Sequence, residues 1–401
     1  MAICRENGMR IHRYWSVRSA PHTDDLETTV EYIRTLLQDT IKRQLIADVP
    51  LVTLLSGGLD SSGITALAGR AFARGGKELH TYSVDFVESA QHFRGSPMHV
   101  SLDAPWAKRV SEHVGTQHHT VVLDTPELVE HVLTTLYAHD YPIPSQMWSS
   151  LYLLFRAMKQ EATVALSGES ADEVFGGYPW FHNEAALTAQ SFPWLPLVEL
   201  QGENALSWLS PAIVQKVRMK QHLEQRYRQA MAEVPRLEGE DGLAARRREM
   251  FYMNQTYLLS CLLERKDRMS MATSLEVRVP FCDYRLVEYV WNIPWEMKMV
   301  DGIEKGLLRR VFADVLPEDV VRRKKSAYPT VQHPAYKEAT RKWALDIVNN
   351  SNAPIQPLLD PRSVRALTEN EATSPVILTS LAERIIQINE WLKHYQVTLS
   401  L

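Results

Sequence analysis

Residue types suited to chemistry gather in the segment LLSGGLDSS, residues 54–62, where a short apolar run gives way to a helical pattern. Gly57 and Gly58 let the backbone approach a ligand closely and adopt positive φ, and the amides of this loop and of the next helical turn then face an anion. The segment is not a Walker A loop, because that motif places a Lys beside its Ser or Thr, whereas Asp60 precedes Ser61. A carboxylate beside a phosphate cradle indicates a bridging cation, so Asp60 is a candidate magnesium ligand. A tight strand-to-helix turn without a ligand is the alternative interpretation.

A second loop rich in carboxylates, SGESADEVFGG at residues 167–177, follows another strand-like run. In a doubly wound sheet, the loops at the carboxyl ends of the strands converge on one crevice. We therefore expect Glu169 and Asp172 to share that crevice with Asp60. Like charges gathered there require a metal or a cationic substrate group to compensate them. For Glu173, a solvated position in an acidic loop is the alternative.

Three further segments carry charge. Residues 322–325 are four consecutive cations, ordinarily a solvated face, but beside a phosphate cradle one of them is expected to neutralise charge on a leaving pyrophosphate. Residues 246–248 are three arginines, for which a solvated helix face is favoured over contact with an anionic partner. Residues 264–281 interleave charged and apolar side chains, as a buried helix and turn facing a substrate would, although composition alone does not establish this.

The elements that must position these segments alternate between strand and helix. One expected strand is the short apolar run at residues 51–55, which is bounded by breakers, and further strand-like runs recur at residues 79–86, 118–123 and 163–166. Helical patterns are expected at residues 24–45, 62–74, 104–114, 126–137, 151–160, 284–291, 304–315 and 380–394. This alternation predicts an α/β fold with a doubly wound parallel sheet. We expect a leader at residues 1–23, a nucleotide-binding core at 24–183 and a mainly helical part at 184–401.

Composition narrows the class of protein. With 401 residues, 45% hydrophobic and 23% charged, the chain has the composition of a globular protein with a sizeable core. A formal net charge of −4 argues against nucleic-acid binding, which needs a clustered excess of Lys and Arg. No apolar run approaches the ~20 residues of a membrane span, and no signal peptide is visible. Three cysteines without CxxC spacing indicate neither a disulfide framework nor a zinc site, so a cytoplasmic location is expected.

Four segments in this order resemble the synthetase domain of glutamine-dependent asparagine synthetases. They are LLSGGLDSS at 54–62, LSGESADEVFGG at 166–177, SLEVRVPFCD at 274–283 and RRKKSAYP at 322–329. The resemblance covers residues 24–326 and implies a PP-loop ATP pyrophosphatase fold with a largely helical carboxyl-terminal part.

The resemblance also implies an activity, with ATP and Mg²⁺ as cofactors and a small carboxylate and ammonia as partners. The side chain of aspartate would attack the α-phosphate of ATP, pyrophosphate would leave, and ammonia would displace AMP from the acyl-adenylate. Asp60 and Asp172 would hold magnesium, Glu169 would support formation of the adenylate, and Lys325 would stabilise charge as pyrophosphate departs. The residues expected to contact the nucleotide are Leu54, Ser56, Gly57, Gly58, Asp60, Ser61, Val84, Ser167 and Gly168.

Two departures from the family pattern leave alternatives open. The family's amino-terminal glutaminase uses a cysteine directly after the initiator Met, whereas this chain has Ala2 and only about fifty residues before the loop at 54–62, so we expect ammonia to come from solution or from a separate glutaminase. Residues 143–150 carry Met147 and Trp148, which would either line the crevice and alter the acid accepted or pack inside a helix.

The competing functions fall into three classes. An amide-forming enzyme of natural-product biosynthesis, such as a β-lactam synthetase, would carry a tyrosine at Glu169 paired with a glutamate at Glu276, and that tyrosine is absent. A non-catalytic nucleotide-binding relative is disfavoured by the intact Asp60, Glu169, Asp172 and Lys325. A tRNA thiolase would need a basic face or a cysteine pair. The oligomeric state, a homodimer included, stays open.

Overall fold

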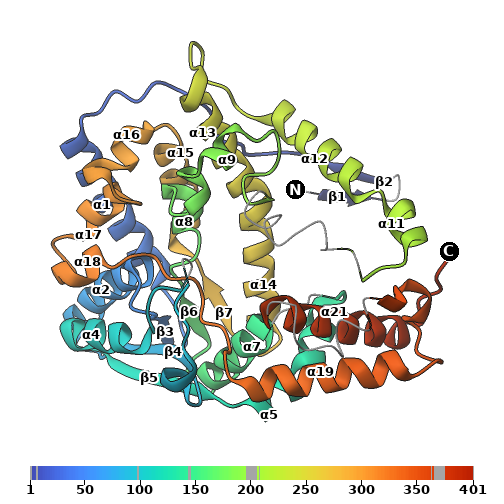
Figure 1. Cartoon of the computed structure of the whole chain (residues 1–401). Coiled ribbons are helices and arrows are strands. Elements are labelled where there is room, and N and C mark those ends of the chain that lie inside the picture. The colour runs from blue at the N-terminus through green and yellow to red at the C-terminus, as the bar shows by residue number, and fades with distance from the viewer. Residues whose placement is uncertain are drawn as a thin grey trace.

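The computed structural model describes residues 2–5, 8–96, 99–142, 146–195, 206, 208–362, 364 and 375–400. Within these ranges a five-stranded sheet runs in the order β5-β4-β3-β6-β7, and each neighbouring pair is parallel (Figure 1). The strands are β3 (Leu51–Leu54), β4 (His80–Phe86), β5 (Gln117–Leu123), β6 (Val164–Leu166) and β7 (Glu276–Arg278). The chain adds strands outward on one side of β3 and then returns to its other side. The strand order therefore reverses between β3 and β6, and the loops that leave them diverge around a crevice.

Helices cover both faces of this sheet, as the doubly wound prediction requires. On one face lie α1 (Leu26–Gln44), α2 (Leu59–Arg74) and α4 (Ala104–Val114), and on the other α7 (Gln146–Lys159) and α14 (Leu259–Met271) (Figure 1). Side chains alternate along each strand. Leu51 therefore packs in the core on the side of α1, α2 and α4, and its neighbour Val52 packs in the core on the side of α7 and α14. The α/β fold class is confirmed.

The four expected strands are confirmed to within one residue, and one strand was missed. β7 lies inside the segment at 264–281 that was expected to be a helix and turn, and α14 occupies only the first part of that segment. A three-residue strand of sequence EVR offers no apolar alternation, so periodicity could not find it. β7 extends the sheet from a segment beyond residue 183, and the division of the chain at that residue stays a prediction.

Most of the expected helices are present with shifted ends. The cap of α1 is Asp25, whose Oδ1 accepts from the Thr28 amide at 2.8 Å, rather than Asp24. The helix expected at 126–137 is divided into α5 (Thr125–Glu130) and α6 (Val132–His139). The leader contains a hairpin in which β1 (Ala2–Arg5) pairs with β2 (Gly8–Ile11). The remaining short helices beside the sheet are α3 (Ser89–His92) and α8 (Ala171–Phe175).

The chain beyond the second acidic loop is mainly helical, as expected. Its helices before β7 are α9 (Glu184–Thr188), α11 (Pro211–Val217), α12 (Met219–Glu233) and α13 (Gly242–Met253), with a π-helical turn at Asn254–Leu258 leading into α14. Those after β7 are α15 (Tyr284–Trp291), α16 (Trp295–Lys298), α17 (Gly306–Phe312), α18 (Glu318–Arg322), α19 (Pro334–Asn349) and α21 (Pro375–His394). In the part of the chain that the structure describes, no helix is long and apolar enough to cross a membrane.

The arginine run at 246–248 is not a solvated face, which corrects the expectation. Arg246 donates to the carbonyls of Ala186, Leu187 and Ala189 and so ties α13 to the end of α9. Arg248 is buried against Glu240, and the Arg247 guanidinium lies over the Trp295 ring at 4.6 Å. All three groups are used to hold helices together.

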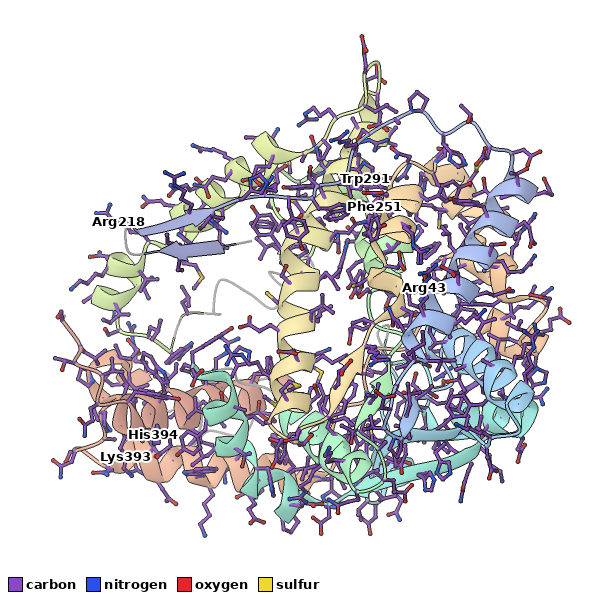
Figure 2. All side chains as sticks on the ribbon, turned by 180° about the vertical axis from the view of Figure 1, so that it is seen from behind. Arg43, Arg218, Phe251, Trp291, Lys393 and His394 are labelled. Atoms are coloured by element: carbon purple, nitrogen blue, oxygen red, sulfur yellow. The ribbon has the colours of Figure 1, made fainter. Side chains whose placement is uncertain are left out.

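An aromatic core lies under these arginines. Phe251 and Trp291, labelled in Figure 2, belong to one buried cluster that joins α13 and α15. Phe251 packs against Phe181, with ring centroids 4.5 Å apart. The cations therefore cap an apolar layer, which explains their burial better than an anionic partner would.

Candidate functional site

A cavity opens at the carboxyl edge of the sheet, between the loops that follow β3 and β6. The two loops come from strands that neighbour each other where the strand order reverses. Every residue expected in the site lines this cavity except Gly57: Leu54, Ser56, Gly58, Asp60, Ser61, Val84, Ser167, Gly168, Glu169, Asp172 and Lys325. Segments far apart in the sequence thus meet where a doubly wound fold places its ligands.

The first loop builds its turn around Gly57. Gly57 has φ +72°, and an added Cβ would lie 2.4 Å from the backbone of Trp106 at the start of α4. Gly58 has φ −73° and serves as the cap of α2, so only one of the two glycines takes the positive φ expected of both. Ser61 Oγ donates to the Gly58 carbonyl and lies 3.1 Å from Ser56 Oγ. The first-turn amides of α2 have no acceptor within the helix and remain available to an anion.

The second loop approaches the first closely. A Cβ on Gly168 would lie 2.6 Å from the amide nitrogen of Ser61, so no larger residue fits between the loops. Ser170 holds φ +81° at the start of α8, and its hydroxyl lies 2.9 Å from Cys282 Sγ. The conformation of the loop presents Glu169 and Asp172 to the cavity.

A buried lysine that the sequence analysis missed joins the two predicted metal ligands. Lys305 is only 2% exposed, and its Nζ lies 2.7 Å from both carboxylate oxygens of Asp60 and 2.8 Å from Asp172 Oδ1. Lys325 Nζ also donates to Asp172, and it lies 5.0 Å from the centre of the Tyr178 ring. Two carboxylates and two ammonium groups therefore form a single network between the loops.

The network shifts the pKa values of its members in opposite directions. Burial, reinforced by the charge of Asp172, raises the pKa of Asp60. Burial alone would also raise the pKa of Asp172, but Lys305 and Lys325 outweigh it and hold that pKa well below the usual range. Desolvation of Lys305 is likewise outweighed by the two carboxylates, which raise its pKa. Asp172, which pairs with both lysines, is therefore the carboxylate that stays ionised. Asp60 takes up a proton more readily than Asp172 does.

Glu169 belongs to a second network. Its Oε2 lies 2.9 Å from Lys266 Nζ and 3.7 Å from Arg265 Nη2, both on α14. Lys266 also donates to Ser167 Oγ at 3.0 Å. Although burial opposes it, the attraction of these cations lowers the pKa of Glu169. The carboxylate is therefore ionised and acts as an acceptor.

The basic run at 322–325 divides between the cavity and solvent. Lys325 reaches the cavity, as expected of one member of the run. Arg323 is buried, bonds Asp103 Oδ1 at 2.7 Å and donates to the Ser56 carbonyl at 3.0 Å, so it supports the first loop from below. Arg322 and Lys324 are exposed.

The charge balance corrects the expectation that the carboxylates need a metal or a substrate cation to compensate them. Four carboxylates of the described lining are outnumbered by cations from the chain itself. The carboxylates are Asp60, Asp103, Glu169 and Asp172, and the cations are Arg265, Lys266, Lys305, Arg309, Arg323 and Lys325. The cavity is therefore suited to a polyanion, whose charge the surplus cations would neutralise.

Glu173 is not solvated, which corrects the alternative interpretation of this residue. It is 1% exposed, Tyr178 Oη donates to its Oε1, and it faces away from solvent behind the cavity. Burial, together with the charge of Asp172, raises the pKa of Glu173 to about 8. The side chain is therefore a buried group that ionises with difficulty, and it is not part of the described cavity lining.

The structure places two residues that bear on the alternatives left open by the sequence, Trp148 and Glu276. Trp148 packs within the core between α7 and the sheet, with its ring centroid 4.7 Å from that of His139, and is not part of the described cavity lining. The helix-packing interpretation is therefore the right one for Trp148; residues 143–145 lie outside the described residues. Glu276 is exposed on β7 and pairs with Arg278 at 2.6 Å, so it makes no pair with Glu169.

Comparison with known proteins gives consistent matches over most of the chain. The family model described as asparagine synthase matches residues 32–393. Asparagine synthetase [glutamine-hydrolyzing] 3 of Bacillus subtilis is 42% identical over 98% of this chain and 65% of its own length. Asparagine synthetase [glutamine-hydrolyzing] 1 of the same organism is 27% identical over 84% of this chain and 55% of its own.

The chain thus spans about two thirds or less of the length of these relatives. Among solved structures, an NAD+ synthetase from Burkholderia pseudomallei matches 40% of this chain and 60% of its own at 18% identity, with a TM-score of 0.23.

Proposed function

Because the chain belongs to the asparagine synthase family, we propose that it is an ATP-dependent ligase that forms the amide of asparagine from aspartate and ammonia. In the first step an oxygen of the aspartate side chain bonds to the α-phosphorus of ATP, the bond from that phosphorus to the β-phosphate oxygen breaks, and pyrophosphate leaves. In the second step the nitrogen of ammonia bonds to the acyl carbon, AMP departs with the electrons of the broken bond, and the nitrogen gives up a proton.

The nucleotide would lie across the two facing loops. Gly58 and the first-turn amides of α2 would hold the β- and γ-phosphates that leave as pyrophosphate. Leu54, the last residue of β3, and Val84, on the neighbouring strand β4, would contact adenosine together with Ser167 and Gly168.

Magnesium would be held by Asp60 and Asp172. The residues fit such an ion in their chemistry, since both carboxylates line the cavity in which the phosphates would lie, and Mg²⁺ is commonly bound by one or two carboxylates together with substrate phosphates. The ion would supply charge neutralisation on the phosphates. Lys325, already paired to Asp172, would stabilise the charge that develops on departing pyrophosphate.

Glu169 would act as a fixed negative charge in the cavity rather than as an acid, because Lys266 and Arg265 keep it ionised. Its fixed charge would favour the cationic nitrogen that forms when ammonia attacks. A glutaminase, as a separate subunit or as a domain, would supply ammonia from glutamine.

The observation that carries this proposal is the convergence of Asp60, Asp172 and Lys325 in one cavity lined by a surplus of cations. This combination suits an acyl-adenylate synthetase, because such an enzyme must bind a triphosphate and then stabilise a leaving pyrophosphate.

The test is to incubate the protein with ATP, Mg²⁺ and aspartate, with ammonium or with glutamine, and to follow pyrophosphate release and the products by mass spectrometry. We expect asparagine and AMP with ammonium. Lys325→Met should lower the turnover about 10²-fold or more, whereas the exposed neighbour Lys324→Met should not. Absence of both pyrophosphate and asparagine, with ATP still bound, would overturn aspartate as the acid.

A further inference from the structure

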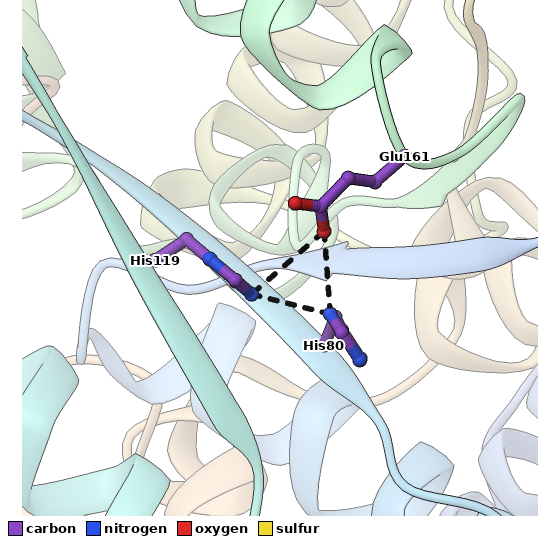
Figure 3. A group of neighbouring side chains, drawn as sticks. All are labelled: His80, His119 and Glu161. Carbon is purple, nitrogen blue, oxygen red and sulfur yellow. Dashed lines mark hydrogen bonds and ion pairs between the residues drawn. The ribbon is translucent and has the colours of Figure 1, made fainter.

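Two histidines and a glutamate form a compact group near the amino-terminal end of the sheet, away from the edge that carries the cavity (Figure 3). His80 Nδ1 lies 3.1 Å from His119 Nε2. Glu161 Oε2 lies 3.4 Å from the same His80 nitrogen and 3.9 Å from the His119 nitrogen. Figure 3 shows the three side chains pointing toward one another.

Rigid elements hold the group. His80 is the first residue of β4, and His119 lies opposite Tyr82 on the paired strand β5. The rings of His80 and His119 stack at 5.2 Å, and the Tyr82 ring stacks on His119 at 4.7 Å. Glu161 lies between α7 and β6, where Tyr82 Oη donates to its Oε2 at 2.6 Å. The sheet thus sets the positions of the two histidines, and the hydrogen bond from Tyr82 on β4 holds the Glu161 carboxylate beside them.

The spacing of these atoms matches the edges of a metal coordination tetrahedron. Bonds of about 2.0–2.2 Å from a tetrahedral zinc ion separate two ligand atoms by roughly 3.3–3.6 Å. The separations of 3.1, 3.4 and 3.9 Å bracket that range. We propose that His80, His119 and Glu161 bind a divalent transition metal of the zinc class, with a fourth position open to water or a small anion.

Proton positions permit this assignment. In the described part of the chain neither His80 Nε2 nor His119 Nδ1 has a protein hydrogen-bond partner, so each ring can carry its proton there and turn a lone pair to the metal. The two half-exposed rings and the exposed Glu161 also leave a path for the ion, since His80 and Glu161 border a surface hollow shared with Lys42 and Pro50.

A similar group elsewhere fails the same criterion and serves as a control. Glu88, His92 and His333 also gather within reach of one ion. However, His333 Nδ1 accepts from the Ala335 amide at 3.1 Å, so the proton of the neutral ring resides on Nε2, the nitrogen that faces Glu88. That nitrogen donates a hydrogen bond to Glu88 and has no lone pair for a metal.

The ligand types decide the class of metal. Imidazole nitrogens suit zinc, copper, nickel and cobalt, whereas magnesium prefers oxygen ligands. The hydrogen bond from Tyr82 orients the Glu161 carboxylate, as outer partners of metal ligands commonly do. A bound ion would tie β4 and β5 to the segment that leads into β6, and so would stabilise the sheet against unfolding.

The experiment titrates the full chain, freed of metal by dialysis, with Co²⁺ and with Zn²⁺. We expect one strongly bound Co²⁺ per chain, with the visible absorption of a four-coordinate ion, and a melting temperature that rises with Zn²⁺. His119→Gln and Glu161→Gln should each weaken binding about tenfold or more and abolish the thermal shift. His92→Asn, in the control group, should change neither.

Two results guard against a folding artefact. His80→Cys replaces one zinc-class ligand by another, so it should retain metal binding and add a sulfur-to-cobalt charge-transfer band. Tyr82→Phe should bind with lower affinity, because only the orienting hydrogen bond is removed. The proposal is overturned if wild-type protein binds no stoichiometric metal, or if His119→Gln and Glu161→Gln bind the metal as tightly as wild type.

Discussion

Replacing Lys305 by methionine tests the charge network between the two loops. Methionine is an unbranched side chain without charge, so Lys305→Met removes the ammonium group and leaves most of the apolar stem. The ammonium contacts both oxygens of Asp60 at 2.7 Å and Asp172 at 2.8 Å, and it is 2% exposed. The change therefore leaves two buried carboxylates facing each other.

The expected cost follows from this geometry. Removing one partner of a buried ion pair costs about 3–5 kcal/mol, because the remaining charge stays desolvated. Asp172 retains Lys325, so the lower end of that range, about 3 kcal/mol near neutral pH, is expected. Asp60 then relieves the repulsion by taking a proton, since burial and Asp172 already raise its pKa. A raised folded-state pKa means that stability is retained below the unfolded pKa and is lost as pH rises through the folded one, so the deficit should grow with pH.

The assay is urea unfolding followed by tryptophan fluorescence at several pH values, for wild type, Lys305→Met and the exposed control Lys324→Met. Mg²⁺ should recover part of the loss in Lys305→Met, because a cation can replace the ammonium between Asp60 and Asp172. The reasoning is refuted if the variant loses less than about 1 kcal/mol or if its deficit is the same at low and high pH.

Three further variants test other parts of the site. Glu169→Gln removes the charge that pairs with Lys266, so asparagine formation should fall about 10²-fold and the melting temperature should drop, because Lys266 stays buried without its ion-pair partner; unchanged asparagine formation contradicts the assigned role. Gly168→Ala places a Cβ 2.6 Å from the Ser61 amide, which should force the loops apart and cost about 1–3 kcal/mol with weaker ATP binding in equilibrium titration; unaltered affinity counts against the close approach. Glu173→Gln mimics the protonated carboxyl whose pKa is about 8, so it should remove the loss of stability that wild type shows as pH rises from about 4.5 to 8, measured by thermal melts across that window; identical pH profiles disprove the burial argument.

Local patterns in the sequence were sufficient to predict the frame of the molecule and part of its site. Four strand-like runs separated by helical patterns became neighbouring parallel strands, and the short apolar ones, β3 and β6, lie at the centre of the sheet, where both faces are covered. The loops at 54–62 and 167–177 follow two of these strands directly, and parallel strands bring such loops to one edge of the sheet. Asp60 and Asp172 could therefore be placed in one crevice without coordinates.

Only the tertiary structure decided which side chains from distant segments enter the site. Lys305 lies 245 residues from Asp60, and Lys266 lies 99 residues from Ser167. Each is a single lysine within an ordinary helical segment, and helical periodicity says which face is apolar but not which buried cation meets which carboxylate.

The same limit explains why the solvated interpretations of residues 246–248 and of Glu173 were wrong, and why strand β7 was missed. A run of arginines or acids looks solvated because local composition carries no information on the carbonyls, rings and hydroxyls that pack against it from other elements. β7 is a strand because β6 offers it a free edge, not because its three residues alternate. Burial and partner choice depend on long-range packing, so they are settled only when the chain has folded.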